Sequence, residues 1–119
     1  MGYGNSIRIL IEERDFDRLC EESEKRFPNY YILDYLDVKQ KRVGKNRNHE
    51  KTQYIYFGWN YTKFDGEEEE WIKEFILNLC DHHFVRIGEG VTDIEEYYNL
   101  NYTTVDCIQI VRGFDENSA

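Results

Sequence analysis

The sequence has few residues that would fix the chain covalently or bend it sharply. Its 119 residues include one proline and three cysteines. The odd number of cysteines, Cys20, Cys80 and Cys107, fits reduced thiols in a cytoplasmic protein better than a disulfide framework. All three fall on apolar faces of the elements expected below, so we expect them to be reduced and mostly buried.

Long hydrophobic runs are also missing. No stretch approaches the roughly 18 consecutive apolar residues of a membrane helix, and no charged-then-apolar leader is present, so we expect neither a membrane span nor a signal peptide. The net charge of −9 argues against general nucleic-acid binding and against anionic membranes. With 40% apolar and 33% charged residues, residues 1–119 are expected to form a single domain.

Aromatic and β-branched residues are abundant instead, and they predict the strands. They are dense in segments 30–38 and 52–61, which we expect to be two long strands flanking a loop at 39–51. Isoleucines at every second position over 7–12 predict a strand with one apolar face. The remaining expected strands span 84–87 and 103–112.

Helix signals fall between these strands. Asp15 is the expected N-cap of a first helix, which should end at Phe27 because Pro28 disfavours helical geometry in the residue before it. The four acids at 67–70 should open a second helix, since they complement the positive end of the helix dipole. Residues 92–98 are expected to form a short helical turn.

The resulting order, β-α-β-β-α-β-β, predicts an α+β two-layer sandwich. We expect a mainly antiparallel sheet of about five strands with both helices on one face, and the first six elements match the ferredoxin-like order in type. If the Phe75 ring is enclosed, Phe75→Ala should cost about 3–5 kcal/mol. The expected core is Ile9, Leu19, Phe27, Leu33, Ile55, Phe57, Ile72, Phe75, Ile76, Leu79, Val85, Ile87 and Ile108.

Charge is strongly segregated along the chain. The loop at 39–51 holds six cations against one acid, a net charge of +5, so the other residues sum to −14. The loop could grip phosphates as a basic β-ribbon, dock into an acidic patch of a protein or of a second copy of this chain, or be a solvated hairpin tip. Its cations are Lys39, Lys41, Arg42, Lys45, Arg47 and Lys51.

The acids concentrate on the expected exposed faces of the two helices and in the segment after the fourth strand. Carboxylates spaced along a rigid face can imitate nucleic-acid phosphates, or they can simply keep the protein soluble. The candidate acidic binding residues are Asp17, Glu21, Glu22, Glu24, Glu67, Glu68, Glu69, Glu70, Asp93, Glu95 and Glu96.

Catalytic and metal motifs are weak. Cys80-Asp81-His82-His83 offers ligand types, but no second cluster supplies the rest of a zinc site, so we expect no metal. Arg86-Ile87-Gly88-Glu89-Gly90 lacks the third glycine of a dinucleotide-binding loop and fits a turn better. No carboxylate pair stands out among 24 acids. We therefore expect no catalytic residue and no cofactor, with a small enzyme built on His82, His83 and Arg86 as an alternative.

The chain resembles the small acidic inhibitor proteins of phages and mobile elements, such as anti-CRISPR inhibitors and DNA mimics. The likeness is one of size and composition, without a diagnostic motif, so no functional residue is carried over. It implies action in a host cytoplasm, although the basic loop departs from a uniformly acidic mimic. The residues that carry it are Glu67-Glu68-Glu69-Glu70-Trp71, Asp93-Ile94-Glu95-Glu96-Tyr97-Tyr98 and the aromatic segments beside the loop.

The leading hypothesis is a non-enzymatic acidic binding module that inhibits or regulates a nucleic-acid-handling protein. Its acidic helices would engage the partner's basic surface, with Trp71, Tyr97 and Tyr98 as candidate aromatic anchors, although Trp71 could equally be core. Direct nucleic-acid binding through the loop at 39–51 is the alternative, and self-association is a further one.

Overall fold

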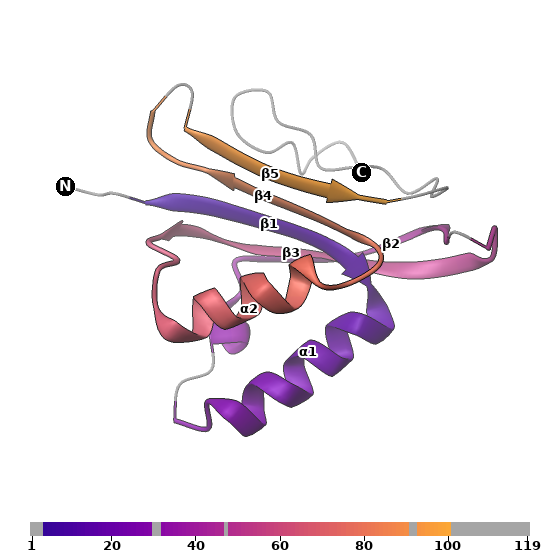
Figure 1. The fold of residues 1–119 in the computed structure, drawn as a ribbon, viewed down its shortest axis with the longest axis horizontal. Helices are drawn as coiled ribbons and strands as arrows, with labels where there is room; N and C mark the ends of the chain where they lie inside the picture. The colour runs from indigo at the N-terminus through magenta and orange to yellow at the C-terminus, as the bar shows by residue number, and fades with distance from the viewer. Residues whose placement is uncertain (1–3, 30–31, 47, 91–92, 101–119) are drawn as a thin grey trace.

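A computed structural model describes residues 4–29, 32–46, 48–90 and 93–100, which form a sheet with two helices packed on one face (Figure 1). Within these residues, no helix is long and apolar enough to cross a membrane. The elements are β1 (Asn5–Glu12), α1 (Glu13–Arg26), a 3-10 turn η1 (Ile32–Tyr35), β2 (Val38–Lys45), β3 (Lys51–Thr62), α2 (Glu67–Leu77), β4 (His82–Ile87) and β5 (Ile94–Asn99).

The sheet has the strand order β2-β3-β1-β4-β5, and all neighbouring strands are antiparallel. In the central strand β1, Ile9 lies opposite Phe57 of β3 on one side and Phe84 of β4 on the other. The expected α+β architecture is therefore confirmed. The order of the first four strands is that of a ferredoxin-like sheet, to which β5 adds an edge.

The main core lies between the sheet and the helices. Alternate residues of β1, such as Ile9, meet Leu19 of α1 and Ile72 and Ile76 of α2, and all four side chains are fully buried. Ile7, Ile9 and Ile11 all belong to this core, so the apolar face expected for the first strand is confirmed. Leu10 faces the other side and is also fully buried, as part of a second cluster. This second cluster comprises Leu10, Tyr54, Tyr56, Val85 and Leu100.

Most of the expected core residues are buried, with three exceptions. Phe27, Phe75 and Ile87 are only half-buried, because each lies at the margin of a packed layer. Ile108 lies outside the described residues.

The expected strand at 30–38 is wrong. Ile32–Tyr35 forms a 3-10 turn, and β2 begins at Val38, where that strand was expected to end. The cause is tertiary: the Ile32 carbonyl accepts a hydrogen bond from Trp59 Nε1 (3.0 Å), and the Ile32 N–H donates one to Glu68 Oε1 (3.2 Å). Side chains distant in sequence thus satisfy backbone groups that a strand would have paired in a ladder.

The expected loop at 39–51 is mostly strand, which also corrects the sequence prediction. β2 and β3 pair from Val38 opposite Gly58 to Lys45 opposite Lys51. Asn46 shapes the short turn between them, since its side-chain oxygen accepts hydrogen bonds from the N–H groups of Asn48 (2.9 Å) and Glu50 (3.0 Å). We call β2, β3 and this turn the basic hairpin.

The expected helical turn at 92–98 is also wrong, because residues 94–99 form β5. Pairing with β4 places Glu95 opposite Arg86, and the ion pair between them stabilises the extended form. The fifth strand expected at 103–112 lies outside the described residues. α1 begins at Glu13, before the expected cap Asp15, whereas α2 begins at Glu67 as expected.

Candidate binding surface

The two helices run antiparallel, and this arrangement gathers acids from separate segments at one end of the helix layer. The ring of Phe27, just after α1, lies 5.9 Å from that of Trp71 in the first half of α2, and Arg18 lies over Phe75 further along. The end of α1 therefore adjoins the start of α2 (Figure 1). We call the following carboxylates the acidic end: Glu21, Glu22, Glu24, Asp34, Glu67, Glu69 and Glu70.

The acidic end is largely unneutralised by the chain itself. Six of its seven side chains are exposed and Glu69 is half-buried. Within the described residues, Glu21 alone among them forms a salt bridge, with Lys25 at 3.4 Å. Asp17 is exposed nearer the middle of α1. The acidic end therefore concentrates negative charge that is available to an outside partner.

Glu68 does not belong to this surface, and the expectation that it is exposed is wrong. It is only 3% exposed and accepts hydrogen bonds from Ser23 Oγ (2.8 Å) and from the Ile32 N–H (3.2 Å). Burial raises the pKa of the Glu68 carboxyl, and the two hydrogen bonds oppose that rise. Helical spacing explains its position, since Glu68 shares a face with the buried Ile72 and Ile76.

The acids expected at 93–96 hold β5 to its neighbours. Arg86 binds Asp93 (2.8 Å) and Glu95 (3.1 Å), and Lys73 of α2 binds Glu95 at 2.6 Å. Burial alone would raise the pKa of Glu95, but hydrogen bonds from Lys73, Tyr97 and Arg86 lower it to about 2. Glu96 contacts His83 Nε2 at 2.6 Å. These carboxylates all have partners within the chain, whereas among the described residues only Glu21 of the acidic end has a salt-bridge partner.

The tip of the basic hairpin, from Lys45 to Lys51, lies at the opposite end of the sheet from the acidic end (Figure 1). Lys41 pairs with Glu13 at 3.3 Å, and Lys39 lies over the Phe16 ring at 5.0 Å. Lys45 and Lys51 are exposed and directly opposite each other. β2 is an edge strand of the described sheet, and lysines on such an edge oppose pairing with other strands.

The basic hairpin contains two arginines, Arg42 and Arg47. Arg42 lies over the Tyr56 ring at 4.1 Å and donates a hydrogen bond to Gln40, so part of its capacity is used within the chain. Arg47 lies outside the described residues. The hairpin therefore presents Lys45 and Lys51 as its most clearly solvent-facing cations.

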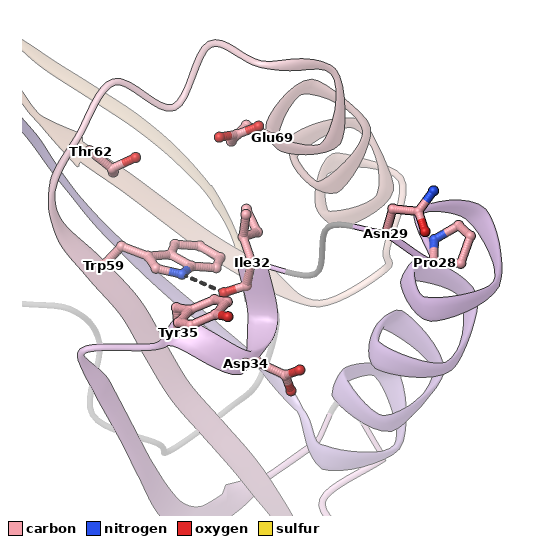
Figure 2. A pocket seen from close by; sticks show the side chains of 8 residues that line it. All are labelled: Pro28, Asn29, Ile32, Asp34, Tyr35, Trp59, Thr62 and Glu69. Atoms are coloured by element: carbon pink, nitrogen blue, oxygen red, sulfur yellow. Dashed lines mark hydrogen bonds between the residues drawn. The ribbon is translucent and has the colours of Figure 1, made fainter.

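A pocket with a volume of about 540 Å³ opens at the acidic end, and we call it the Trp59 pocket. Figure 2 shows the Trp59 indole and the Tyr35 ring on one side of it, with Glu69 and Asp34 on different sides. Trp59 is 5% exposed, whereas Tyr35 is 73% exposed. The lining residues are Pro28, Asn29, Ile32, Asp34, Tyr35, Trp59, Thr62 and Glu69.

The sequence prediction missed this pocket because it treated residues 30–38 as a half-buried strand rather than as a turn. Asp34 is the signal in the sequence that argues against a strand here. It interrupts an apolar run, and an unpaired charge is costly on a buried face. The 3-10 turn resolves that conflict by leaving Asp34 exposed.

The residues proposed for an enzyme are not brought together. His82 and His83 are adjacent in β4, so their side chains lie on opposite faces of the sheet. His82 Nδ1 contacts the Leu79 carbonyl at 3.0 Å, and burial lowers the pKa of His83 against the opposing effect of Glu96. Both histidines therefore lie in a strand, beyond the end of α2. Arg86 is bound by the carboxylates of β5.

The cysteine thiols are less buried than the sequence predicts. Neither Cys20 nor Cys80 is in a disulfide, as expected, but Cys80 is exposed and Cys20 is half-buried, so their expected burial is not met. Cys107 lies outside the described residues. In the part of the chain that the structure describes, no group of three or more histidine, cysteine or carboxylate side chains could hold a metal ion.

The candidate aromatic anchors differ in exposure. Trp71 is half-buried between Phe75 and Phe27, with the Arg26 guanidinium over its ring at 6.0 Å. Tyr97 and Tyr98 are exposed on β5, away from the acidic end. Of the three, only Trp71 adjoins the acidic end.

Comparisons of the chain with known protein families, with curated proteins and with solved structures find no match. The fold itself accommodates many unrelated functions, so its surface must carry the functional conclusion.

Proposed function

We propose that the chain is a non-enzymatic binding module whose acidic end engages a basic, nucleic-acid-binding surface of a protein partner and so inhibits or regulates that partner. The observation that carries the proposal is the gathering of seven carboxylates at one end of the helix layer, of which only Glu21 forms a salt bridge within the described part of the chain. Asp93 and Glu95, by contrast, are paired with Arg86 and Lys73, so their charges are balanced within the chain.

Electrostatics explains how this arrangement would work. Like charges held close together repel, so an unneutralised cluster stabilises the fold poorly but attracts a cationic surface over several ångströms. Complementary charge speeds association and selects against acidic partners. The lysines and arginines of a nucleic-acid channel bind regularly spaced phosphates. The two helices hold the carboxylates of the acidic end at fixed spacings, so these carboxylates can occupy the same cationic sites.

The basic hairpin supports a second candidate, direct nucleic-acid binding. Lys45 and Lys51 face each other across the hairpin, although like charges at directly opposite positions destabilise a sheet. A phosphate placed between them would relieve that repulsion. The tip of the hairpin and the acidic end lie at opposite ends of the molecule, so the lysines of the tip can be altered without disturbing the acidic end (Figure 1).

A competition assay separates the two candidates. Labelled duplex DNA is first bound to polyarginine, and the chain is then added at low and moderate salt. The wild-type chain should displace the DNA by binding polyarginine and should not bind the duplex itself. Glu22→Gln with Glu70→Gln removes one charge from each helix and should weaken displacement about threefold to tenfold.

The matched control removes two charges from the other end. Lys45→Gln with Lys51→Gln should displace DNA as well as the wild type does. Direct, salt-sensitive duplex binding that disappears in this control would overturn the proposal in favour of the basic hairpin. Failure of the wild-type chain to displace DNA at either salt concentration would reject the acidic binding module.

A further inference from the structure

We infer that the Trp59 pocket accepts an arginine side chain of the basic partner. This inference rests on the proposed function and adds a specific anchor to its general charge attraction. The pocket is part of the acidic end, since Asp34 and Glu69 belong to both. Its volume of about 540 Å³ lies within the usual range for ligand pockets and leaves room for a side chain with adjoining backbone.

The chemistry of the lining favours a donor-rich cation. Two carboxylates line the pocket, and no lysine, arginine or histidine is among its described lining residues. The Trp59 indole N–H already donates to the Ile32 carbonyl at 3.0 Å, so the indole presents its ring rather than a donor (Figure 2). Phosphates and carboxylates would meet repulsion here, whereas a cation would be attracted.

Arginine fits this lining better than lysine. The guanidinium is planar, stacks on aromatic faces and offers five N–H donors, whereas the lysine ammonium is a compact and strongly hydrated charge. Tyr35 is exposed on the 3-10 turn and provides a ring on which the guanidinium can stack. Asp34 and Glu69 come from different elements and can accept its hydrogen bonds from different directions.

The placement of Tyr35 also needs a reason. An aromatic ring that is 73% exposed contributes little to folding, yet the hydrogen bonds of Ile32 hold the backbone of the short turn that carries it. An exposed tyrosine on a fixed turn beside two carboxylates is a suitable binding anchor, because the backbone need not reorganise and the ring has few rotatable bonds to order when a partner docks.

Peptide titrations test this inference. Three short peptides with capped, uncharged ends are titrated into the full chain, and they carry a central arginine, lysine or citrulline respectively. The indole N–H signals of Trp59 and Trp71 are followed by NMR. The arginine peptide should shift the Trp59 signal, whereas the citrulline peptide, which is similar in shape but neutral, should bind about tenfold more weakly. The lysine peptide should fall between them.

Matched variants locate the binding. Asp34→Asn should weaken arginine-peptide binding about fivefold or more, whereas Asp17→Asn removes the same charge from an exposed site on α1 and should leave binding unchanged. Tyr35→Ala should weaken binding about threefold or more, and Tyr35→Phe should restore it because the ring is retained. These side chains are exposed, so the substitutions should leave the fold intact, and circular dichroism of each variant checks this.

Three results would overturn the inference. They are an absence of Trp59 shifts at millimolar arginine peptide, equal binding of the citrulline peptide, or equal weakening by Asp17→Asn and Asp34→Asn. The polyarginine assay distinguishes failure of this inference from failure of the proposed function. If Glu22→Gln with Glu70→Gln weakens the displacement of DNA but Tyr35→Ala does not, the acidic end binds the partner and the Trp59 pocket takes no part.

Discussion

Glu68 provides the sharpest test of how the helix layer is joined to the 3-10 turn. One buried carboxylate from α2 accepts hydrogen bonds from Ser23 of α1 and from the Ile32 N–H. Glu68→Ala would leave both donors without a partner, and each buried donor costs about 1–3 kcal/mol when unsatisfied. Removal of a buried charge offsets part of this cost, so we expect the free energy of unfolding to fall by about 2–4 kcal/mol at pH 7.

Glu68→Gln should be far milder because the amide keeps the shape. Its oxygen can accept from the Ile32 N–H, and its NH₂ group can donate to the Ser23 hydroxyl. Burial raises the folded-state pKa of Glu68 above its ordinary value of 4.5, so the carboxylate is penalised at neutral pH. This group contributes most to stability below pH 4.5, and its contribution falls as pH rises through the folded-state pKa.

The measurement is urea unfolding followed by tryptophan fluorescence at pH 7 and at pH 4.5. At pH 7 Glu68→Gln should lie within about 1 kcal/mol of the wild type, and the wild type should gain relative to it as the pH falls. Two results would refute this reasoning: a loss below about 0.5 kcal/mol for Glu68→Ala, or equal losses for the two variants. Equal losses would show that the charge itself, rather than the hydrogen-bond geometry, joins these elements.

Four other substitutions or modifications have clear expected outcomes. Glu95→Gln should lower the free energy of unfolding by about 1–2 kcal/mol at pH 7, and urea titrations should show this difference vanish as pH falls from 4.5 towards 2, because the lowered pKa of Glu95 stabilises its charged form. Lys51→Glu replaces one of two facing lysines and should raise stability by about 0.5 kcal/mol; a loss would show that the facing pair is not repulsive. Phe75→Ala should cost about 1–2 kcal/mol in urea unfolding, less than for an enclosed ring, because Phe75 is half-buried, and a loss above about 3 kcal/mol would contradict this placement. Cys80 should react with a thiol reagent faster than Cys20 in the folded protein, and equal rates would contradict their different exposure.

Local patterns in the sequence were enough to determine the class of fold. Apolar spacing located both helices, and Pro28 and the acids at 67–70 marked where one helix ends and the other begins. The aromatic segment at 52–61 marked β3, and the order of element types predicted the α+β sandwich. These features depend on neighbouring residues, so they can be read without knowledge of distant contacts.

Only the tertiary structure decided two of the segments that the sequence prediction misassigned. Residues 32–35 are a turn because Trp59 and Glu68, both far along the chain, bind the backbone of Ile32. Residues 94–99 are a strand because β4 offers them a pairing edge and Arg86 offers Glu95 an ion pair. In each segment, contacts between distant residues outweigh the local preference.

Tertiary structure also decided the candidate site. The sequence contains the acids, but their grouping depends on the antiparallel packing of α1 and α2, which brings Glu22 and Glu70 to one end and buries Glu68. The Trp59 pocket joins residues from η1, β3 and α2, which no local pattern relates. Charge composition is fixed by the sequence alone, whereas a charged surface with a defined shape exists only after distant segments have packed together.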